Sequence, residues 1–207
     1  MKKFELTSEF VTFLGKKLFR IKALISFGNV KEGELGGFVE KEENLDQSGN
    51  AWVYGNARVS GNARVYGNAK VFGNARVSGN AEVFGNARVS GNAWVSGNAW
   101  VSGNAEVFGN ARVSGNAWVS GNAWVSGNAK VFGNDDYATV HGFGSEYRTT
   151  TFFRTKAGEI GVRCGCFYGT LEEFRAKIKE THGETKTAKE YLMVADLMEF
   201  RFSKEEA

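Results

Sequence analysis

The stretch that decides the fold is Gly49-Asn50-Ala51-Trp52-Val53-Tyr54, which is followed without interruption by thirteen further hexads of the form Gly-Asn-Ala-x-Val-[Ser/Tyr/Phe], the last ending at Phe132. A fixed period of six residues is too short for a helical repeat. It is typical of a β-helix in which three hexads complete one triangular coil. The array therefore predicts about five coils, and at about 4.8 Å per coil the column is expected to be roughly 22 Å long.

Within each hexad, the side chains of a strand alternate between the inside and the outside of the coil. Val59 is expected to point inward, while Arg58 and Ser60 lie on the outer surface. The Ala of each hexad points inward beside the corner, where a larger side chain would overfill the narrow lumen. Gly and Asn form the corner, because Gly adopts a positive φ without steric penalty and Asn side chains at successive corners can form ladders.

The unit Val-Ser-Gly-Asn-Ala-Arg resembles the hexapeptide motif of left-handed β-helices, with an aliphatic residue at one position and a small residue four positions later. Left-handedness is what this resemblance implies, since strand physics alone would favour right-handed crossovers. The flanks also resemble those of phage and prophage proteins with Gly-Asn-Ala arrays, which implies a phage origin. That second resemblance is carried by Gly33-Glu34-Leu35-Gly36-Gly37-Phe38-Val39-Glu40, by Arg148-Thr149-Thr150-Thr151-Phe152 and by Cys164-Gly165-Cys166-Phe167.

The sequence before the array predicts a cap, because an open β-helix end exposes unpaired backbone and an apolar core. Residues 1–35 contain two strand-like runs, Phe4 to Phe13 and Leu18 to Phe27, which predict a β-hairpin. The β-helix with its connecting segments is assigned to residues 36–140.

The sequence after the array, residues 141–207, predicts a small α+β domain of ββαα order. The two strand-like runs are Tyr147 to Thr155 and Glu159 to Phe167. Capping boxes at Thr170 and Thr187 predict the starts of two helices. The expected core face of the second helix consists of Tyr191, Leu192, Val194, Ala195, Leu197 and Met198. The predicted fold class is mainly β, a left-handed parallel β-helix with a β-hairpin cap and this α+β domain.

Composition excludes several classes of protein. The formal net charge is +3, and the array holds seven basic and two acidic residues, which is too mild a charge for a nucleic-acid-binding protein. No apolar run approaches the roughly 20 residues that cross a bilayer, and no signal-peptide core follows Met1, so a cytoplasmic protein without membrane contact is expected. Cys164 and Cys166 are expected to be reduced thiols, because they lie too close together in a probable strand to staple the fold. Their Cys-x-Cys spacing also does not suit structural zinc. No metal or cofactor is predicted.

An enzymatic role is not expected. The best-known enzymes of the resembled fold are acyltransferases, which place a catalytic His at the coil surface between subunits. No hexad contains a His, and both His141 and His182 lie after the array, so neither can act there as a general base. An acyltransferase-like enzyme is kept only as an alternative.

Residues 18 apart are expected to form columns on the outer surface of the coils. One column is basic with one aromatic residue, and together with basic residues of the C-terminal strands it is predicted to bind a host protein or a small anionic ligand. These candidate partner-binding residues are Arg58, Arg76, Trp94, Arg112, Lys130, Arg148, Arg154 and Arg163. The alternative is an ordinary solvated surface. An internal duplication supports this alternative: residues 87–110 and 111–134 differ only at Glu106 and Lys130, so the array resembles one that grows by repeat slippage.

The other two columns are rich in aromatic residues, and all five tryptophans are expected to point outward. Exposed aromatic patches usually mark association surfaces, so a homo-oligomer is predicted, with a trimer as the state common in this fold. The candidate interface residues are Trp52, Tyr54, Phe72, Trp100, Phe108, Trp118 and Trp124.

These features favour a non-catalytic, phage-derived binding or scaffold protein, oligomeric, with its end domains as recognition modules. A more specific alternative is a phage inhibitor of host defence that binds a defence protein or sequesters a nucleotide signal.

Overall fold

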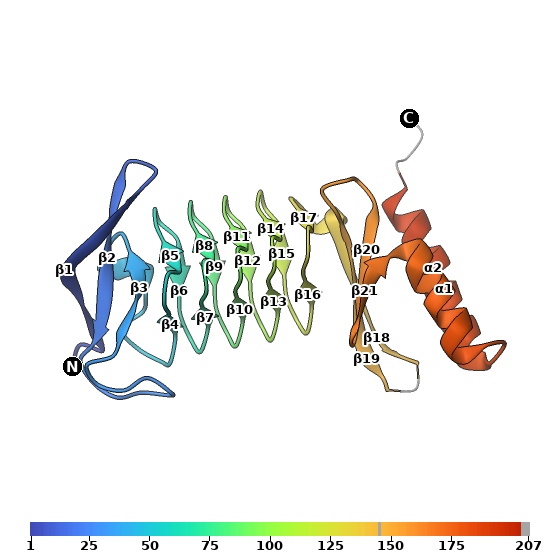
Figure 1. Ribbon diagram of the computed structural model, residues 1–207, viewed down its shortest axis with the longest axis horizontal. Helices are drawn as coiled ribbons and strands as arrows, with labels where there is room; N and C mark the ends of the chain where they lie inside the picture. Colours follow the sequence, from blue (N-terminus) through green and yellow to red (C-terminus); the bar gives the residue numbers. More distant parts are fainter. Residues whose placement is uncertain (145, 204–207) are drawn as a thin grey trace.

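The computed structural model describes residues 1–144 and 146–203, and it forms a rod with three consecutive parts (Figure 1). A β-sheet cap stands at the N-terminal end, a parallel β-solenoid occupies the middle, and a small sheet covered by two helices closes the other end. Residue 145 and residues 204–207 of the predicted C-terminal domain lie outside the described residues. Among the helices of the described ranges, none is long and apolar enough to cross a membrane.

The solenoid contains three parallel sheets, one on each face of the coil, which we name by their side chains. The basic face consists of β5 (Arg58–Val59), β8 (Arg76–Val77), β11 (Trp94–Val95), β14 (Arg112–Val113) and β17 (Lys130–Val131). The mixed face consists of β4 (Trp52–Val53), β7 (Lys70–Val71), β10 (Arg88–Val89), β13 (Glu106–Val107) and β16 (Trp124–Val125). The aromatic face consists of β6 (Arg64–Val65), β9 (Glu82–Val83), β12 (Trp100–Val101) and β15 (Trp118–Val119).

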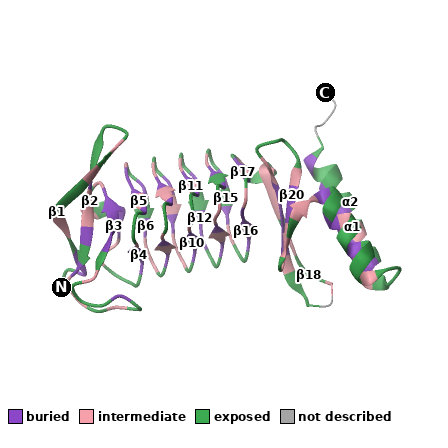
Figure 2. Cartoon of the chain, viewed as in Figure 1, coloured by how far each residue is buried: buried purple, intermediate pink, exposed green. Residues whose placement is uncertain are grey.

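The strand register confirms the coil of three hexads. Val95 pairs with Val77 in the coil before it and with Val113 in the coil after it, so identical hexad positions stack along the rod. Every hexad Val and Ala of the array is buried, as the prediction that both point into the lumen requires. Buried segments recur in each coil of the solenoid (Figure 2). The result is a continuous parallel β-solenoid of about five turns with an apolar core.

The corners confirm the roles predicted for Gly and Asn. Gly97 has a φ of 67°, and a Cβ there would lie 2.9 Å from the backbone nitrogen of Gly115 in the next coil. Asn side chains form ladders along the corners; for example, Asn80 Nδ2 donates to Asn98 Oδ1 at 3.0 Å. Glycine is therefore needed for two reasons, its conformation and the close approach of the next backbone.

The N-terminal cap contains the predicted hairpin, β1 (Phe4–Phe13) and β2 (Lys16–Ala23), which pair antiparallel. A third strand, β3 (Leu35–Val39), was not predicted. It pairs antiparallel with β2 and parallel with β5, so it joins the antiparallel hairpin to the parallel solenoid. Its Leu-Gly-Gly-Phe-Val sequence offered a weak strand signal because Gly is rare in strands. A Cβ at Gly36 would lie 2.6 Å from the Val53 oxygen, so the close approach requires this glycine.

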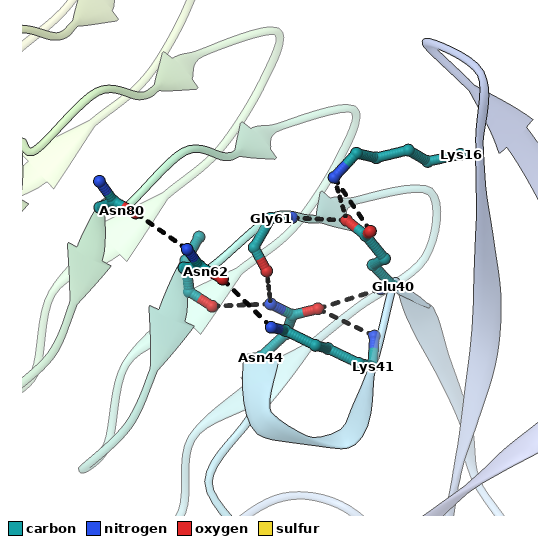
Figure 3. Close-up of polar contacts among 8 residues, drawn as sticks. Lys16, Glu40, Lys41, Asn44, Gly61, Asn62 and Asn80 are labelled. Carbon is teal, nitrogen blue, oxygen red and sulfur yellow. Dashed lines mark hydrogen bonds and ion pairs between the residues drawn. The ribbon is translucent and has the colours of Figure 1, made fainter.

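The short 3₁₀-helix η1 (Glu42–Asn44) covers the next corner of the first coil (Figure 3). The Asn44 side chain is fully buried. It donates a hydrogen bond to the Gly61 oxygen of the following coil and accepts one from the backbone nitrogen of Glu40. Beside it, Glu40 accepts hydrogen bonds from the backbone nitrogen of Gly61 at 2.6 Å and from Lys16 Nζ. Side chains thus satisfy backbone groups that have no preceding coil to pair with.

The C-terminal sheet differs from the two strands predicted. After η2 (Asn134–Asp136) it has the order β18-β19-β20-β21, with bounds Tyr137–Phe143, Arg148–Arg154, Ile160–Cys164 and Phe167–Thr170. The predicted strand from Glu159 to Phe167 ends earlier, at Cys164, because Gly165 adopts a φ of 57° and the chain reverses into β21. The predicted boundary after residue 140 lies within β18.

Strand β19 separates two cores through the alternation of its side chains. Phe153 points into the lumen of the solenoid and belongs to its core, whereas Phe152 packs with the helices. Trp124 N donates to Thr151 Oγ1 at 2.9 Å, so the same face of β19 also pairs with the last coils. One face of the sheet therefore covers the end of the solenoid, and the other face packs against the two helices.

The helices are α1 (Leu171–His182) and α2 (Lys186–Phe202). The capping box at Thr170 is confirmed, since its hydroxyl accepts from Glu173 N and its own N–H donates to the Glu173 carboxylate. The predicted start at Thr187 is wrong, because Thr185 is the N-cap of α2. Leu197 was predicted in the core but is 56% exposed.

Candidate functional site

The basic face carries the first predicted column in register. Arg58, Arg76, Trp94, Arg112 and Lys130 lie on successive strands of one sheet and pair position by position. The guanidinium groups of Arg58 and Arg76 lie 5.0 and 4.9 Å from the centroid of the Phe13 ring. Arg112 lies over Trp94 at 5.8 Å. Aromatic rings therefore hold several of these cations in place on the surface.

The cations of this column have no acidic partner among the residues that the structure describes. Within residues 1–144 and 146–203, none of Arg58, Arg76, Arg112 and Lys130 forms an ion pair. On the mixed face, by contrast, Arg88 pairs with Glu106 at 3.3 Å. The column therefore presents two pairs of unneutralised cations on neighbouring strands, Arg58 with Arg76 and Arg112 with Lys130, on either side of Trp94, and such cations can attract an anionic group.

The aromatic face carries a continuous series of ring contacts from coil to coil. Tyr66 stacks on Phe84 with ring centroids 4.9 Å apart, and Phe84 meets Trp100 edge-on at 6.2 Å. Trp100 in turn meets Trp118 at 5.7 Å and an interplanar angle of 73°. Trp100 and Trp118 remain 42% and 49% exposed. Beside Arg64 and Glu82, the face therefore presents a patch of aromatic side chains on a parallel sheet.

Polar contacts orient two of the rings of this face, those of Tyr66 and Trp118. Trp118 Nε1 donates to Ser102 Oγ at 3.0 Å, and this hydrogen bond orients the indole ring against the preceding coil. Tyr66 donates from its hydroxyl to Glu82 Oε2 at 2.6 Å. Burial and the Glu82 carboxylate raise the pKa of Tyr66 to about 12, so the phenol stays neutral. The face is therefore preorganised rather than a loose set of side chains.

The mixed face does not form the predicted interface as one surface. Trp52 was expected to point to solvent, but it is fully buried and packs edge-on against Phe4 and Phe27, with centroids 6.2 and 5.3 Å away. The reason is that the N-terminal cap covers the outer side of the first coil. Tyr54 is half-buried and packs against the solenoid core.

The other predicted interface residues of the mixed face contact cations of the same chain. Arg88 lies over Phe72 at 5.3 Å. Arg163 of β20 lies over Phe108 at 5.9 Å and over Trp124 at 5.2 Å. Each of these rings is therefore covered on one side by a cation of the same chain.

The arginines predicted for the C-terminal strands are divided between the two faces of the sheet. Arg163 lies on the solenoid side of the sheet, as its contact with Trp124 shows. Arg154 lies on the helix side, over the Phe202 ring, and pairs with Asp136 at 3.5 Å. Arg148 borders a cavity and pairs with Glu146 at 3.5 Å. A strand presents alternate residues to opposite faces, so Arg148 and Arg154 share the helix side of β19, whereas Arg163 lies on the other side of the sheet.

Two features were missed by sequence reasoning. One is the cavity of about 300 Å³ between β20, β21 and the helices, lined in part by Cys164, Cys166 and His182. The other is an exposed apolar stripe on α2, formed by Met193, Leu197 and Phe200. The i, i+4, i+7 spacing of the stripe was visible, but the same helix has a second apolar face, which forms the core. As for metals, the described part of the chain contains no cluster of three or more His, Cys, Asp or Glu side chains that could hold an ion.

Comparison with known families supports the repeat architecture. A family model described as the YdcK beta solenoid repeat matches residues 51–67, 57–71, 81–97, 87–103, 105–121 and 111–127, all within the array. No curated protein matches the chain. The repeat match and the stacked coils together show that this chain is a repeat β-helix protein, with an array similar to the YdcK beta solenoid repeat.

Proposed function

We propose that the protein is a non-catalytic scaffold that associates with further copies of itself through the aromatic face. The observation that carries this proposal is the exposure of Trp100 and Trp118, 42% and 49%, on adjacent strands. Large aromatic side chains contribute most to association when they are buried at the centre of an interface. The hydrogen bond from Trp118 to Ser102 favours binding, because a fixed side chain loses little entropy when it is covered.

The shape of the face suits a second copy of the same chain. Strands of the solenoid present side chains at one spacing along the rod, so two or three copies can align with their rings in register. A trimer, with three aromatic faces around one axis, is the state we expect. The two ends of the rod then remain free as recognition modules.

Sedimentation velocity of the full chain tests this proposal. We expect a multimer for the unmodified protein and a monomer for Trp100→Ser plus Trp118→Ser. The matched control is Phe10→Ser plus Phe200→Ser, which removes two exposed aromatic rings from the caps and should keep the multimer. A monomeric unmodified protein, or a multimeric Trp100→Ser plus Trp118→Ser variant, would contradict the proposal.

We further propose that the basic face binds an anionic partner, because its cations lack carboxylate partners within the described residues. With the phage origin that the flanks suggest, the partner would be a host defence protein or a nucleotide signal. Calorimetric titration with inorganic tripolyphosphate tests the electrostatic part. Arg76→Glu plus Arg112→Glu should abolish the binding heat, whereas Lys179→Glu plus Lys189→Glu, with the same change of net charge on the helices, should retain it. Binding that survives the first pair of substitutions would exclude the basic face.

A further inference from the structure

The C-terminal domain contains a cavity that the scaffold function does not use. It has a volume of about 300 Å³ and lies between the β20–β21 hairpin and helices α1 and α2. This volume is at the lower end of the range for small-molecule sites. It lies on the helix side of the sheet, away from the solenoid, at the far end of the rod (Figure 1).

The floor of the cavity is apolar and ordered by aromatic contacts. Phe174 and Ile178 of α1 are 4% and 3% exposed and form part of the domain core. Phe167 of β21 packs against Phe174 with ring centroids 5.4 Å apart, and Tyr191 of α2 meets Phe174 edge-on at 5.8 Å. A floor of this kind accommodates a hydrocarbon chain or one aromatic ring.

The polar side chains inside the cavity include Cys164 and Tyr191. The Cys164 thiol accepts a hydrogen bond from Thr150 Oγ1 at 3.1 Å. The pKa of Tyr191 is raised to about 12, mainly by burial and to a smaller extent by the neighbouring Cys164, so this phenol carries no charge. The Arg, Lys and Glu side chains that line the cavity lie at its mouth.

Two cations line the mouth of the cavity, Arg148 and Lys177, and their side chains are 53% and 52% exposed. Lys177 forms an exposed ion pair with Glu180 at 3.0 Å. Glu146 also lines it, and its carboxylate lies 3.5 Å from Arg148 Nη2. The guanidinium group at the mouth thus already faces a carboxylate, on a side chain that is 66% exposed and free to move aside.

We propose that this cavity binds a small carboxylate with an apolar tail. The tail lies on Phe167, Phe174 and Ile178, and the carboxylate takes the place of Glu146 on Arg148, with Lys177 beside it. A planar guanidinium binds a carboxylate through two parallel hydrogen bonds, and such charge-assisted bonds are stronger than neutral ones. Cys164 at the floor provides a chemical reporter of occupancy.

The test measures how fast Cys164 reacts with the neutral reagent 4,4′-dithiodipyridine in the full chain carrying Cys166→Ser. The probe is 4-phenylbutyrate, and 4-phenylbutan-1-ol is its neutral analogue of similar size. With about a dozen non-hydrogen atoms, such a ligand is expected to bind with a Kd on the order of millimolar. We expect the carboxylate to protect the thiol at concentrations about tenfold lower than the alcohol, which corresponds to one charge-assisted contact.

Substitutions at the mouth give opposite predictions. Arg148→Gln plus Lys177→Gln should remove the preference for the carboxylate, whereas Glu146→Gln should strengthen protection by removing the competing group. The control, Lys179→Gln plus Lys189→Gln, makes the same change of charge outside the cavity and should behave as the parent. All of these side chains are at the surface, and thermal melting of each variant checks that it folds.

Two outcomes would overturn the proposal. One is that phenylbutyrate leaves the reaction rate of Cys164 unchanged at tens of millimolar, on the scale of the expected affinity. The other is that alcohol and carboxylate protect equally in the parent, which would make the cavity a nonspecific apolar cleft. Neither outcome depends on the oligomeric state or on the aromatic face.

Discussion

The side-chain amide of Asn44 donates from Nδ2 to the backbone oxygen of Ala63 at 2.8 Å, where a preceding coil would supply a backbone N–H. The same nitrogen donates to the Gly61 oxygen at 3.0 Å, and the amide oxygen accepts from the backbone nitrogens of Glu40 and Lys41 (Figure 3). In regular coils these carbonyl positions accept from backbone, as in the bond from Arg64 N to Ala81 O. The buried Asn44 side chain therefore supplies the hydrogen-bond donor that a preceding strand would supply, and the backbone hydrogen bonding of the solenoid ends there.

The first prediction concerns the stability of this cap. Asn44→Ala should lower the free energy of unfolding by about 2 to 4 kcal/mol, because it leaves buried donors and acceptors without partners. Asn62→Ala, which removes an exposed ladder side chain, should cost less than about 1 kcal/mol. Urea denaturation monitored by circular dichroism measures both. Equal losses of stability for the two substitutions would contradict the view that Asn44 stabilises the chain by satisfying buried backbone groups.

The second prediction separates the two reasons for glycine at the corners. Gly97 and Gly121 have φ values of 67° and 66°, but a Cβ at Gly97 would lie 2.9 Å from Gly115 N, whereas nothing lies within 4 Å at Gly121. Gly121→Ala should cost about 1 to 2 kcal/mol for backbone strain alone. Gly97→Ala should cost clearly more, because adjacent coils must also separate. Thermal melting of the two variants measures the difference, and equal melting temperatures would leave backbone strain as the only reason.

The third prediction concerns the lumen. Val95 is completely buried in the middle of the solenoid, with coils on both sides that cannot move inward. Val95→Ala should lower the free energy of unfolding by roughly 2 kcal/mol or more through lost burial and a cavity. Ser96→Ala, on the outside of the same hexad, should change it by less than about 0.5 kcal/mol. A small effect of Val95→Ala in urea denaturation would mean that the coils close around the gap.

The fourth prediction is a pH dependence that originates at Lys3. Its Nζ donates to the oxygen of Ala51 at 3.0 Å inside the N-terminal cap, and the residue is 2% exposed. Burial lowers the pKa of Lys3 from 10.5 to about 8, against a smaller opposing effect of Asp46. Between about pH 8 and 10.5 the unfolded chain binds this proton and the folded chain does not. The free energy of unfolding should therefore rise with pH in that window, by at most about 3 kcal/mol.

Urea denaturation between pH 7 and 10 checks the effect of Lys3, with Lys3→Met as the control that should flatten the profile. Measurements stop at pH 10 because Tyr66 acts in the opposite direction above it. Its pKa is raised to about 12, so the stability that its neutral form contributes is lost as the pH rises from 10 towards 12. A flat profile for the parent protein between pH 8 and 10 would show that Lys3 is not desolvated.

The agreement between sequence and structure is best where the chain repeats. Position within the hexad predicted that Val95 is buried, that Gly97 turns the corner, and that Trp94 stacks between Arg76 and Arg112. Each hexad meets copies of itself, so its surroundings can be read from the repeat. The basic column was therefore found in register, although its role is still a proposal.

The agreement is poorest where the repeat meets the caps. Trp52 occupies the same hexad position as Trp100, yet it is buried because Phe4 and Phe27 lie over it. The cavity was missed for the same reason. Its apolar floor and its cations come from separate segments, and their pattern along the chain resembles that of any amphipathic helix and strand.

The sequence alone was sufficient for the coil, its three faces, its inward Val and Ala side chains and the need for a cap at each end, because these follow from interactions repeated at a fixed spacing. Only the folded chain decided which tryptophans are exposed, how Asn44 and Lys3 end the ladder, and where Arg148 meets the cavity of the C-terminal domain. Those features arise from single contacts between segments that are not related by the repeat. No periodic pattern encodes such contacts, so packing in three dimensions determines them.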